Sequence, residues 1–260
     1  MAQTTGVNLD LEGKTALVTG ASRGIGAASA LALAGAGVRR FILHYNGYKA
    51  GVDAISASLK SQGASTEILQ ADLSQQSGIA ALVADFHHLS TPVDILINNA
   101  GSLVKRARLA EYTPDLFDEV MNLNVKSAWF LSQAVAPGMI EAGGGYIINL
   151  SSIAARNGGG PGATIYAAAK AAVATITKGL AKELAPKGIR VNAVSPGTVD
   201  NDFHSKFSNR QILDAAVAQT PAGKLGDNEE VADTIVFLCS HAARFIHGQT
   251  IEINGGMYMA

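Results

Sequence analysis

Short apolar segments alternate with longer segments of helical periodicity along the whole chain, and this alternation limits the possible folds more than any other feature. The apolar segments, which we predict to be strands, are 15–19, 38–45, 65–71, 94–97, 145–150, 189–195 and 250–253. The predicted helices are 24–36, a segment ending near 62, 75–89, 114–141, 165–184 and 229–239. Strands that alternate with helices favour right-handed crossovers and a parallel sheet with helices on both faces. Several of the strands are nearly continuous apolar runs, as expected where both faces of a sheet are buried.

The chain is predicted to form one domain over residues 1–260. Hydrophobic residues make up 48% and charged residues 16% of the sequence, so the chain has enough apolar surface for a sizeable core and is not disordered. No linker, repeat or low-complexity tract divides it. The polar stretch that follows the sixth strand, up to about residue 222, is predicted to be irregular.

Charge and cysteine content narrow the class of protein. Lys and Arg number 20 against 21 Asp and Glu, so the basic excess expected of a nucleic-acid binder is missing. The single cysteine, Cys239, cannot form an internal disulfide, which indicates a reducing compartment. No apolar run reaches the roughly 18 residues of a membrane span, and residues 1–14 lack the pattern of a signal peptide. We therefore expect a cytoplasmic protein with no nucleic-acid or membrane partner.

A glycine cluster follows the first predicted strand. The sequence contains 28 glycines, above the roughly 7% that is usual, and Gly20, Gly24 and Gly26 lie where the strand runs into a helix. Glycines at such a turn let backbone amides approach a pyrophosphate, which then lies at the positive end of the helix dipole. A tight turn without a ligand is the alternative. The position of the cluster in an alternating fold favours phosphate binding.

Further motifs occur in a fixed order along the chain. They are Thr19-Gly-Ala-Ser-Arg-Gly-Ile-Gly26, Asn98-Asn-Ala-Gly101, Leu123-Asn-Val125, Ser152, the Tyr166/Lys170 pair and Pro196-Gly197. In these motifs the sequence resembles the short-chain dehydrogenase/reductase family over nearly all of its 260 residues. The resemblance implies a single-domain, Rossmann-like, doubly wound sheet, a nicotinamide dinucleotide cofactor, reversible hydride transfer and a homotetramer.

The resemblance also implies which residues contact the cofactor, with Asp72 at the adenine and Pro196-Gly197 at the nicotinamide. Relatives often have a threonine five residues after Pro196, whereas this chain has Asn201, which puts that contact in doubt. The complete set of implied cofactor residues is Gly20, Ser22, Arg23, Gly24, Ile25, Gly26, Tyr45, Asn46, Gly47, Asp72, Leu73, Asn98, Ala100, Gly101, Tyr166, Lys170, Pro196, Gly197 and Val199.

The choice between NADP(H) and NAD(H) depends on the end of the second strand. An NAD-selective site needs an acid there to bind the ribose 2′-hydroxyl, but no carboxylate occurs from Gly13 to Val52. Arg23 lies in the glycine turn, and its guanidinium can pair with a 2′-phosphate. If Arg23 is only a solvated surface charge, both cofactors bind. We expect NADP(H) as the cofactor, with NAD(H) as the weaker alternative.

Tyr166 and Lys170 are separated by four positions, so a helix places them on one face. A nearby ammonium is expected to stabilise the phenolate and to lower the tyrosine pKa, as acid–base catalysis at neutral pH requires. The resemblance implies that Ser152 polarises the carbonyl, that Lys170 also binds the nicotinamide ribose, and that Asn124 holds a water linked to Lys170. Ser151 is a rival of Ser152, and a Tyr-x3-Lys pair alone is usually structural. Together these residues predict the catalytic set Ser152, Tyr166, Lys170 and Asn124.

Cations follow the fourth, fifth and sixth strands, whose carboxyl ends face the substrate in this fold. They are Lys105, Arg106, Arg108, Arg156, His204, Lys206 and Arg210. Such a set favours a polar, anionic small-molecule substrate, an oxo acid or a keto-sugar acid such as an oxo-uronate, although ordinary surface charges are an equal alternative. The candidate substrate residues are Ser152, Arg156, Asn157 and His204, with a mobile lid at about 198–222.

Two other functions remain open. One is a 3-oxoacyl-(acyl-carrier-protein) reductase, in which Lys105 and Arg106 would dock an acidic carrier protein. The other is a catalytically silent dinucleotide-binding module, which would have no need of Ser152, Tyr166 and Lys170. His87 and His88 lack partner ligands at a suitable spacing, so we expect no metal site.

Overall fold

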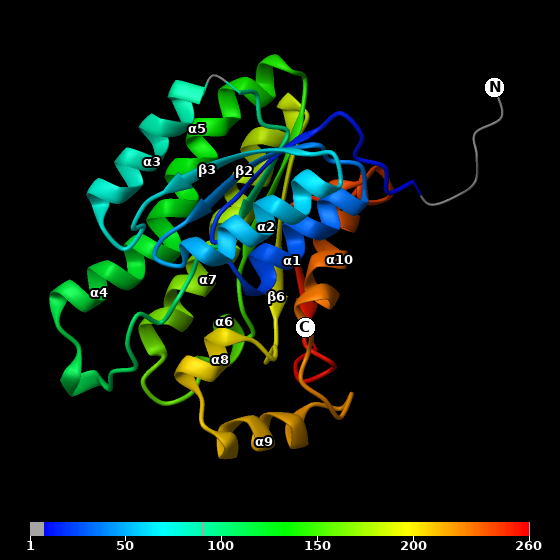
Figure 1. The fold of residues 1–260 in the computed structure, drawn as a ribbon. Helices are drawn as coiled ribbons and strands as arrows, with labels where there is room; N and C mark the ends of the chain where they lie inside the picture. Colours follow the sequence, from blue (N-terminus) through cyan, green and yellow to red (C-terminus); the bar gives the residue numbers. More distant parts are fainter. Residues whose placement is uncertain (1–7, 90, 260) are drawn as a thin grey trace.

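The computed structural model describes residues 8–89 and 91–259. Residues 1–7, on which part of the expectation about a signal peptide rests, lie outside the described residues. Seven parallel strands form one sheet in the order β3-β2-β1-β4-β5-β6-β7 within the described ranges (Figure 1). The strands are β1 (Thr15–Val18), β2 (Arg40–Tyr45), β3 (Ser65–Gln70), β4 (Ile95–Asn98), β5 (Gly145–Leu150), β6 (Ile189–Pro196) and β7 (Thr250–Ile253).

The strand order reverses at β1, which confirms the predicted doubly wound sheet. Leu17 of β1 is paired with Ile42 of β2 on one side and with Leu96 of β4 on the other. Crossovers run outward from β1 in both directions, so the loops after β1 and β4 separate there. In open α/β sheets, ligands bind in the crevice at this point, outside the carboxyl ends of the strands.

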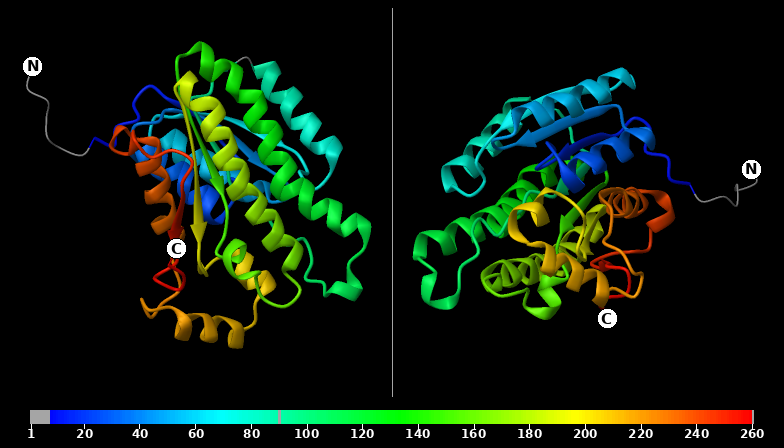
Figure 2. Two further views of the ribbon diagram at one scale, coloured as in Figure 1. Left: turned by 180° about the vertical axis from the view of Figure 1, so that it is seen from behind. Right: turned by 60° about the horizontal axis from the view of Figure 1, so that its bottom comes forward.

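Helices cover both faces of the sheet, as Figures 1 and 2 show. One layer consists of α1 (Gly24–Gly35), α2 (Lys49–Ser61) and α10 (Asn228–Cys239), and the other of α3 (Gln76–Leu89), α5 (Ser127–Glu141) and α7 (Thr164–Leu184). Successive strand residues point to opposite faces, so Val18 belongs to the core under the first layer and Leu17 to the core under the second. Both side chains are fully buried.

The predicted helix over 114–141 consists of three parts. An α-helix, α4 (Pro114–Met121), leads into a π-helical turn, η2 (Asn122–Lys126), and then into α5. Thr113 caps the start of α4, where its hydroxyl accepts a hydrogen bond from the Leu116 amide at 3.2 Å. The apolar periodicity is continuous through the π turn, so the single predicted helix was wrong in this detail.

The stretch predicted to be irregular after β6 contains two short helices, α8 (Asp202–Phe207) and α9 (Arg210–Gln219). Asn201 and Asn209 cap them, because each side chain accepts a backbone N–H of the first turn. Both helices lie beyond the carboxyl ends of the strands, at the lower end of the molecule in Figure 1. The remaining short helices are η1 (Leu109–Glu111), α6 (Ala154–Asn157), η3 (Ala185–Lys187) and η4 (His241–Ala243).

Within the described ranges, none of the helices combines the length and the apolar character that a bilayer crossing requires.

Candidate active site

A cavity of about 730 Å³ opens where the strands end. The glycine turn after β1 and the loops after β2, β4, β5 and β6 contribute to its walls, and α8 and α9 close it from below. The cavity therefore lies at the edge of the sheet at which the fold predicts a ligand.

The glycine turn needs its glycines for two different reasons. Gly20 and Gly24 have φ angles of +65° and +58°, in the left-handed region that side chains disfavour. A Cβ on Gly26 would collide with the Gly20 carbonyl oxygen, so this glycine permits close packing at the start of α1. The Asn99 amide group donates hydrogen bonds to the carbonyls of Thr19 and Gly20 at 2.8 and 3.2 Å. Asn99 thus fixes the turn, a role that its place in the Asn98–Gly101 motif does not reveal.

His44, near the end of β2, supports the same turn from beneath. The Gly20 amide donates to its Nδ1 at 3.2 Å, and its Nε2 lies 3.1 Å from the carbonyl oxygen of Ala71. Burial lowers the pKa of His44 to about 4, despite the hydrogen bond to Ala71 and the charge of Asp72, which raise it. The ring is therefore neutral at pH 7, with its proton on Nε2. Nothing in the sequence distinguishes His44 from the other residues of the predicted strand 38–45, so its role is visible only in the structure.

Tyr166 and Lys170 lie on one face of α7, and the Lys170 Nζ is 5.6 Å from the centre of the Tyr166 ring. That amine donates a hydrogen bond of 2.7 Å to the Leu150 carbonyl, and burial lowers the pKa of Lys170 to about 8. Burial also raises the pKa of Tyr166 to about 12, while a hydrogen bond with Ser152 opposes that rise. The expected lowering of the tyrosine pKa by Lys170 is not found, because the amine is directed to a carbonyl rather than to the phenol oxygen.

The structure separates the two adjacent serines. The Ser151 hydroxyl is buried and donates to the Lys170 carbonyl at 2.9 Å, which joins β5 to α7. The Ser152 hydroxyl instead lies beside Tyr166 and accepts the Ala154 amide at 3.1 Å, at the start of α6. Ser152 is therefore the serine that shares a hydrogen bond with the tyrosine.

Asn124 lies in the π turn and is buried. Its amide group donates to the carbonyls of Ser102 and Val120 at 2.8 and 2.9 Å, and its oxygen accepts the Ser102 amide at 3.2 Å. A Cβ on Gly101 would come within 2.7 Å of this oxygen and 2.8 Å of the Lys170 Nζ. Asn124 thus clamps the loop after β4 close to Lys170. Its side-chain N–H groups bind protein carbonyls, so the predicted water would need a different atom of this residue.

Most of the residues that the resemblance implies for the cofactor line the cavity. These are Gly20, Ser22, Arg23, Gly24, Ile25, Asn46, Gly47, Leu73, Ala100, Gly101, Tyr166, Lys170, Pro196, Gly197 and Val199.

Four of the implied residues do not line the cavity. Gly26 is packed against Gly20, and the Tyr45 hydroxyl donates to Gln70 on β3. Asp72 accepts the amide and hydroxyl of Ser74 in the turn before α3. Asn98 is buried behind the loop after β4, where its amide group donates to the Asn149 side chain at 2.9 Å. Gly26, Tyr45 and Asn98 are thus buried behind the cavity wall, whereas Asp72 is exposed in the turn after β3.

Of the predicted cations, Arg106, Lys206 and His204 line the cavity, as does Asn157. The Arg106 guanidinium donates to the carbonyls of Phe207 at 2.7 Å and Pro161 at 2.9 Å. Burial, together with the charge of Arg106, lowers the pKa of His204, so this ring is neutral at pH 7 rather than a cation.

The other predicted cations point elsewhere. Lys105, Arg108 and Arg210 are exposed and are not part of the cavity wall. Arg156 was a candidate substrate residue, but its Nε donates to the Glu252 carboxylate of β7 at 2.8 Å. This ion pair joins α6 to the C-terminal strand and directs Arg156 away from the cavity.

Known proteins that are similar to this chain belong to the family that the site geometry indicates. A family model described as enoyl-(acyl carrier protein) reductase matches residues 20–258. The chain belongs to the short-chain dehydrogenase/reductase family. It is 38% identical to a 3-oxoacyl-(acyl-carrier-protein) reductase of Staphylococcus epidermidis, over 95% of this chain and 99% of the relative.

Two solved structures are similar over almost their whole length. A gluconate 5-dehydrogenase from Burkholderia cenocepacia, in complex with NADP and tartrate, is 31% identical with a TM-score of 0.86, covering 96% of this chain and 97% of the other. A protein from Beutenbergia cavernae, described as a putative NAD(P)-dependent gluconate 5-dehydrogenase with bound NADP, is 34% identical with a TM-score of 0.88, covering 96% and 98%.

Proposed function

We propose that this member of the short-chain dehydrogenase/reductase family interconverts a carbonyl and an alcohol on a polar, anionic small molecule. An oxo acid or a keto-sugar acid, such as an oxo-uronate, is the substrate class. One observation carries the proposal: the cavity that contains Ser152 and Tyr166 also contains Arg106, a permanent cation fixed by two backbone carbonyls. A guanidinium held in this way can bind a carboxylate through its remaining N–H groups.

The cofactor is NADP(H), which supplies or accepts the hydride. The chain's own residues fit it, because the glycine turn opens α1 toward the cavity and because Gly101, which has no Cβ, lets the loop after β4 lie against Asn124 and Lys170. Arg23, which faces the ring of Tyr48, is the residue that we assign to the 2′-phosphate. Both gluconate-dehydrogenase-like structures contain NADP, and no acid occurs from Gly13 to Val52 in this chain.

The proton chemistry rests on Tyr166 and Ser152. With its pKa raised to about 12, the Tyr166 phenol keeps its proton at neutral pH and can donate it to the oxygen of a carbonyl that is being reduced. The Ser152 hydroxyl lies beside the phenol, where it can orient the same oxygen. Lys170 binds the end of β5 through the Leu150 carbonyl, next to the phenol.

A 3-oxoacyl-(acyl-carrier-protein) reductase is the second candidate. The relative from Staphylococcus epidermidis favours it. Lys105 and Arg108 are exposed outside the cavity wall, where they are able to contact an acidic carrier protein. The same catalytic groups would serve both substrates.

A panel of carbonyl compounds, assayed by NADPH oxidation near pH 7, tests the proposal. We expect oxo acids and keto-sugar acids to be reduced, with kcat/KM at least tenfold above their methyl esters, which lack the negative charge. Strong activity on acyl-carrier-protein esters, with no turnover of any oxo acid, would reverse the order of the two candidates.

We further propose that the chain forms one domain, in which residues 198–222 act as a lid over the cavity. Four such chains would assemble into a homotetramer in the cytoplasm. The two short helices of this segment form one wall of the cavity, which supports that role.

A further inference from the structure

Arg23 has an acidic partner from a distant part of the chain. Its Nη1 lies 3.1 Å from the Oδ2 of Asp202, 179 positions away, and both residues line the cavity. No carboxylate is available to Arg23 from the neighbouring sequence between Gly13 and Val52. The fold therefore supplies an acid that the local sequence lacks.

Asp202 is held beside the glycine turn by its surroundings. It is the first residue of α8, whose cap Asn201 donates from its amide group to the Asn228 side chain at 3.1 Å. A Cβ on Gly24 would lie 3.7 Å from that Asn228 oxygen and 3.9 Å from the Asn201 amide nitrogen. The beginning of α8 is thus in contact with the turn that contains Arg23.

We propose that Asp202 determines how strongly the enzyme prefers NADPH to NADH, by competing with the 2′-phosphate for Arg23. A carboxylate and a phosphate use the same N–H groups of a guanidinium. They also repel each other when both lie near it. NADH has a hydroxyl at this position and can bind with the ion pair intact. Asp202 therefore weakens NADPH binding selectively. This inference rests on the proposed role of Arg23.

The competition has a structural consequence. Arg23 and Asp202 join the glycine turn to α8, so a 2′-phosphate that takes over Arg23 releases one contact of the lid. The side chains are 56% and 61% exposed, so the ion pair itself is weak and can exchange partners readily.

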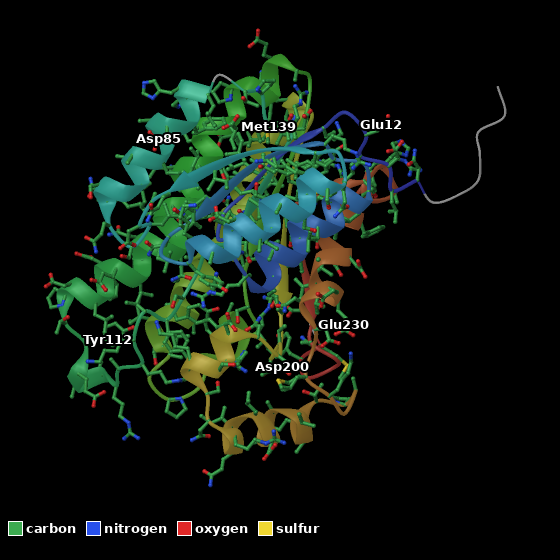
Figure 3. All side chains as sticks on the ribbon, in the orientation of Figure 1. Glu12, Asp85, Tyr112, Met139, Asp200 and Glu230 are labelled. Atoms are coloured by element: carbon green, nitrogen blue, oxygen red, sulfur yellow. The ribbon has the colours of Figure 1, made fainter. Side chains whose placement is uncertain are left out.

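The experiment compares Asp202→Asn with Asp200→Asn in the full-length enzyme, with Kd values for NADPH and NADH measured by fluorescence titration. Asp200, labelled in Figure 3, is an exposed acid two residues away whose charge acts on His204. We expect Asp202→Asn to lower the Kd for NADPH about three- to tenfold and to leave the Kd for NADH within twofold. Asp200→Asn should change both by less than twofold.

Arg23→Ala provides the second arm. It should raise the Kd for NADPH and remove the effect of Asp202→Asn in the double variant. The inference about Asp202 is overturned if Asp202→Asn has no effect, if it affects both cofactors equally, or if its effect persists in the absence of Arg23. Any of these results leaves the assignment of Arg23 to the 2′-phosphate unaffected. An unchanged NADPH-to-NADH preference in Arg23→Ala overturns the assignment of the 2′-phosphate as well. The carbonyl panel tests the reductase activity separately from both.

Discussion

Burial shifts the pKa values of several residues around the cavity. It raises the pKa of Tyr166 and lowers those of Lys170 and His44, since an interior of low dielectric disfavours the charged form of each group. The sequence predicted the spacing of Tyr166 and Lys170, because it depends only on helical periodicity. It could not predict that the Lys170 amine binds the Leu150 carbonyl, since that contact depends on how β5 is packed against α7.

Replacing Tyr166 by Phe removes the only atom of this side chain that can carry a proton to a substrate oxygen. We expect kcat to fall by at least 10³-fold, near the upper part of the range for a lost general acid, with NADPH affinity within about threefold of the wild type. Stopped-flow NADPH oxidation and a binding titration measure the two quantities. Substantial turnover by the variant would contradict the assignment of Tyr166.

His44 makes the stability of the fold depend on pH. Its pKa is about 4 in the folded chain and 6.5 ordinarily, so between these values the unfolded chain binds more protons. The free energy of unfolding is therefore complete above pH 6.5 and falls as the pH drops toward 4, by roughly 2–3 kcal/mol. Urea unfolding at pH 7.0, 5.5 and 4.5 measures this fall.

The matched variants are His44→Asn and His87→Asn. Asn at position 44 can still accept the Gly20 amide through its Oδ1, although it does not reach the Ala71 carbonyl. Because Asn does not titrate, the loss of stability of this variant in acid should be smaller by that amount. His87 is exposed at the end of α3 and should leave the pH dependence unchanged. An identical pH dependence in wild type and His44→Asn would show that other groups cause the loss.

At the scale of whole elements, the strands and most helices were predictable because their apolar periodicity reports burial directly. The π turn at Asn122–Lys126 was not predictable, since it leaves that periodicity intact. Neither were α8 and α9, since both are short and neither contains a buried residue that would mark a face toward the core. The orientation of a side chain in or near a loop could not be predicted from the sequence either. Arg156 follows Ser152 closely in the sequence, yet it pairs with Glu252, 96 positions away.

Arg106 connects three elements around the cavity: the loop after β4, the rim at Pro161 and the end of α8 at Phe207. We expect Arg106→Ala to raise the KM for an anionic oxo acid at least tenfold while changing kcat less, since a charge-assisted contact is lost. Arg106→Lys should recover only part of this, because an ammonium lacks the planar fork of a guanidinium.

The methyl ester of the same oxo acid serves as the control substrate for Arg106. Its KM should change much less, because it offers no carboxylate. Equal increases in KM for acid and ester would mean that Arg106 supports the lid and does not recognise charge. Initial-rate measurements with both substrates distinguish the two roles.

At the scale of the whole molecule, large apolar side chains remain exposed on the α4–α5 side. Phe117, Trp129 and Phe130 are each more than a third exposed. A second cavity lies at the start of α4 and is lined by residues that include Tyr112 and Phe117. Figure 3 labels Tyr112 on that side of the molecule. Apolar surface of this kind indicates contact with another chain, which supports the proposed tetramer.

Light scattering should give a mass of four chains of 26.8 kDa each. Trp129→Asp combined with Phe130→Asp should reduce it, because two carboxylates would then be buried in the interface. Lys60→Asp, on the exposed side of α2, should leave the mass unchanged. A monomer mass for the wild-type chain would contradict the proposal.

The π turn limits which changes of length this chain can accept. A π turn holds one residue more than regular α-helix over the same rise. Loss of any one residue from 122–126 would let α4 and α5 join as an unbroken helix, with better local hydrogen bonding. α4 and α5 could keep their relative orientation, since the extra residue is accommodated within the turn, but the residues that remain in the turn would shift by one position along the helix. The Asn124 amide group would then leave Ser102. Exchange of a side chain at a partly buried position of this turn would therefore leave the turn in place, whereas a single deletion would produce a more regular helix and a disordered active site.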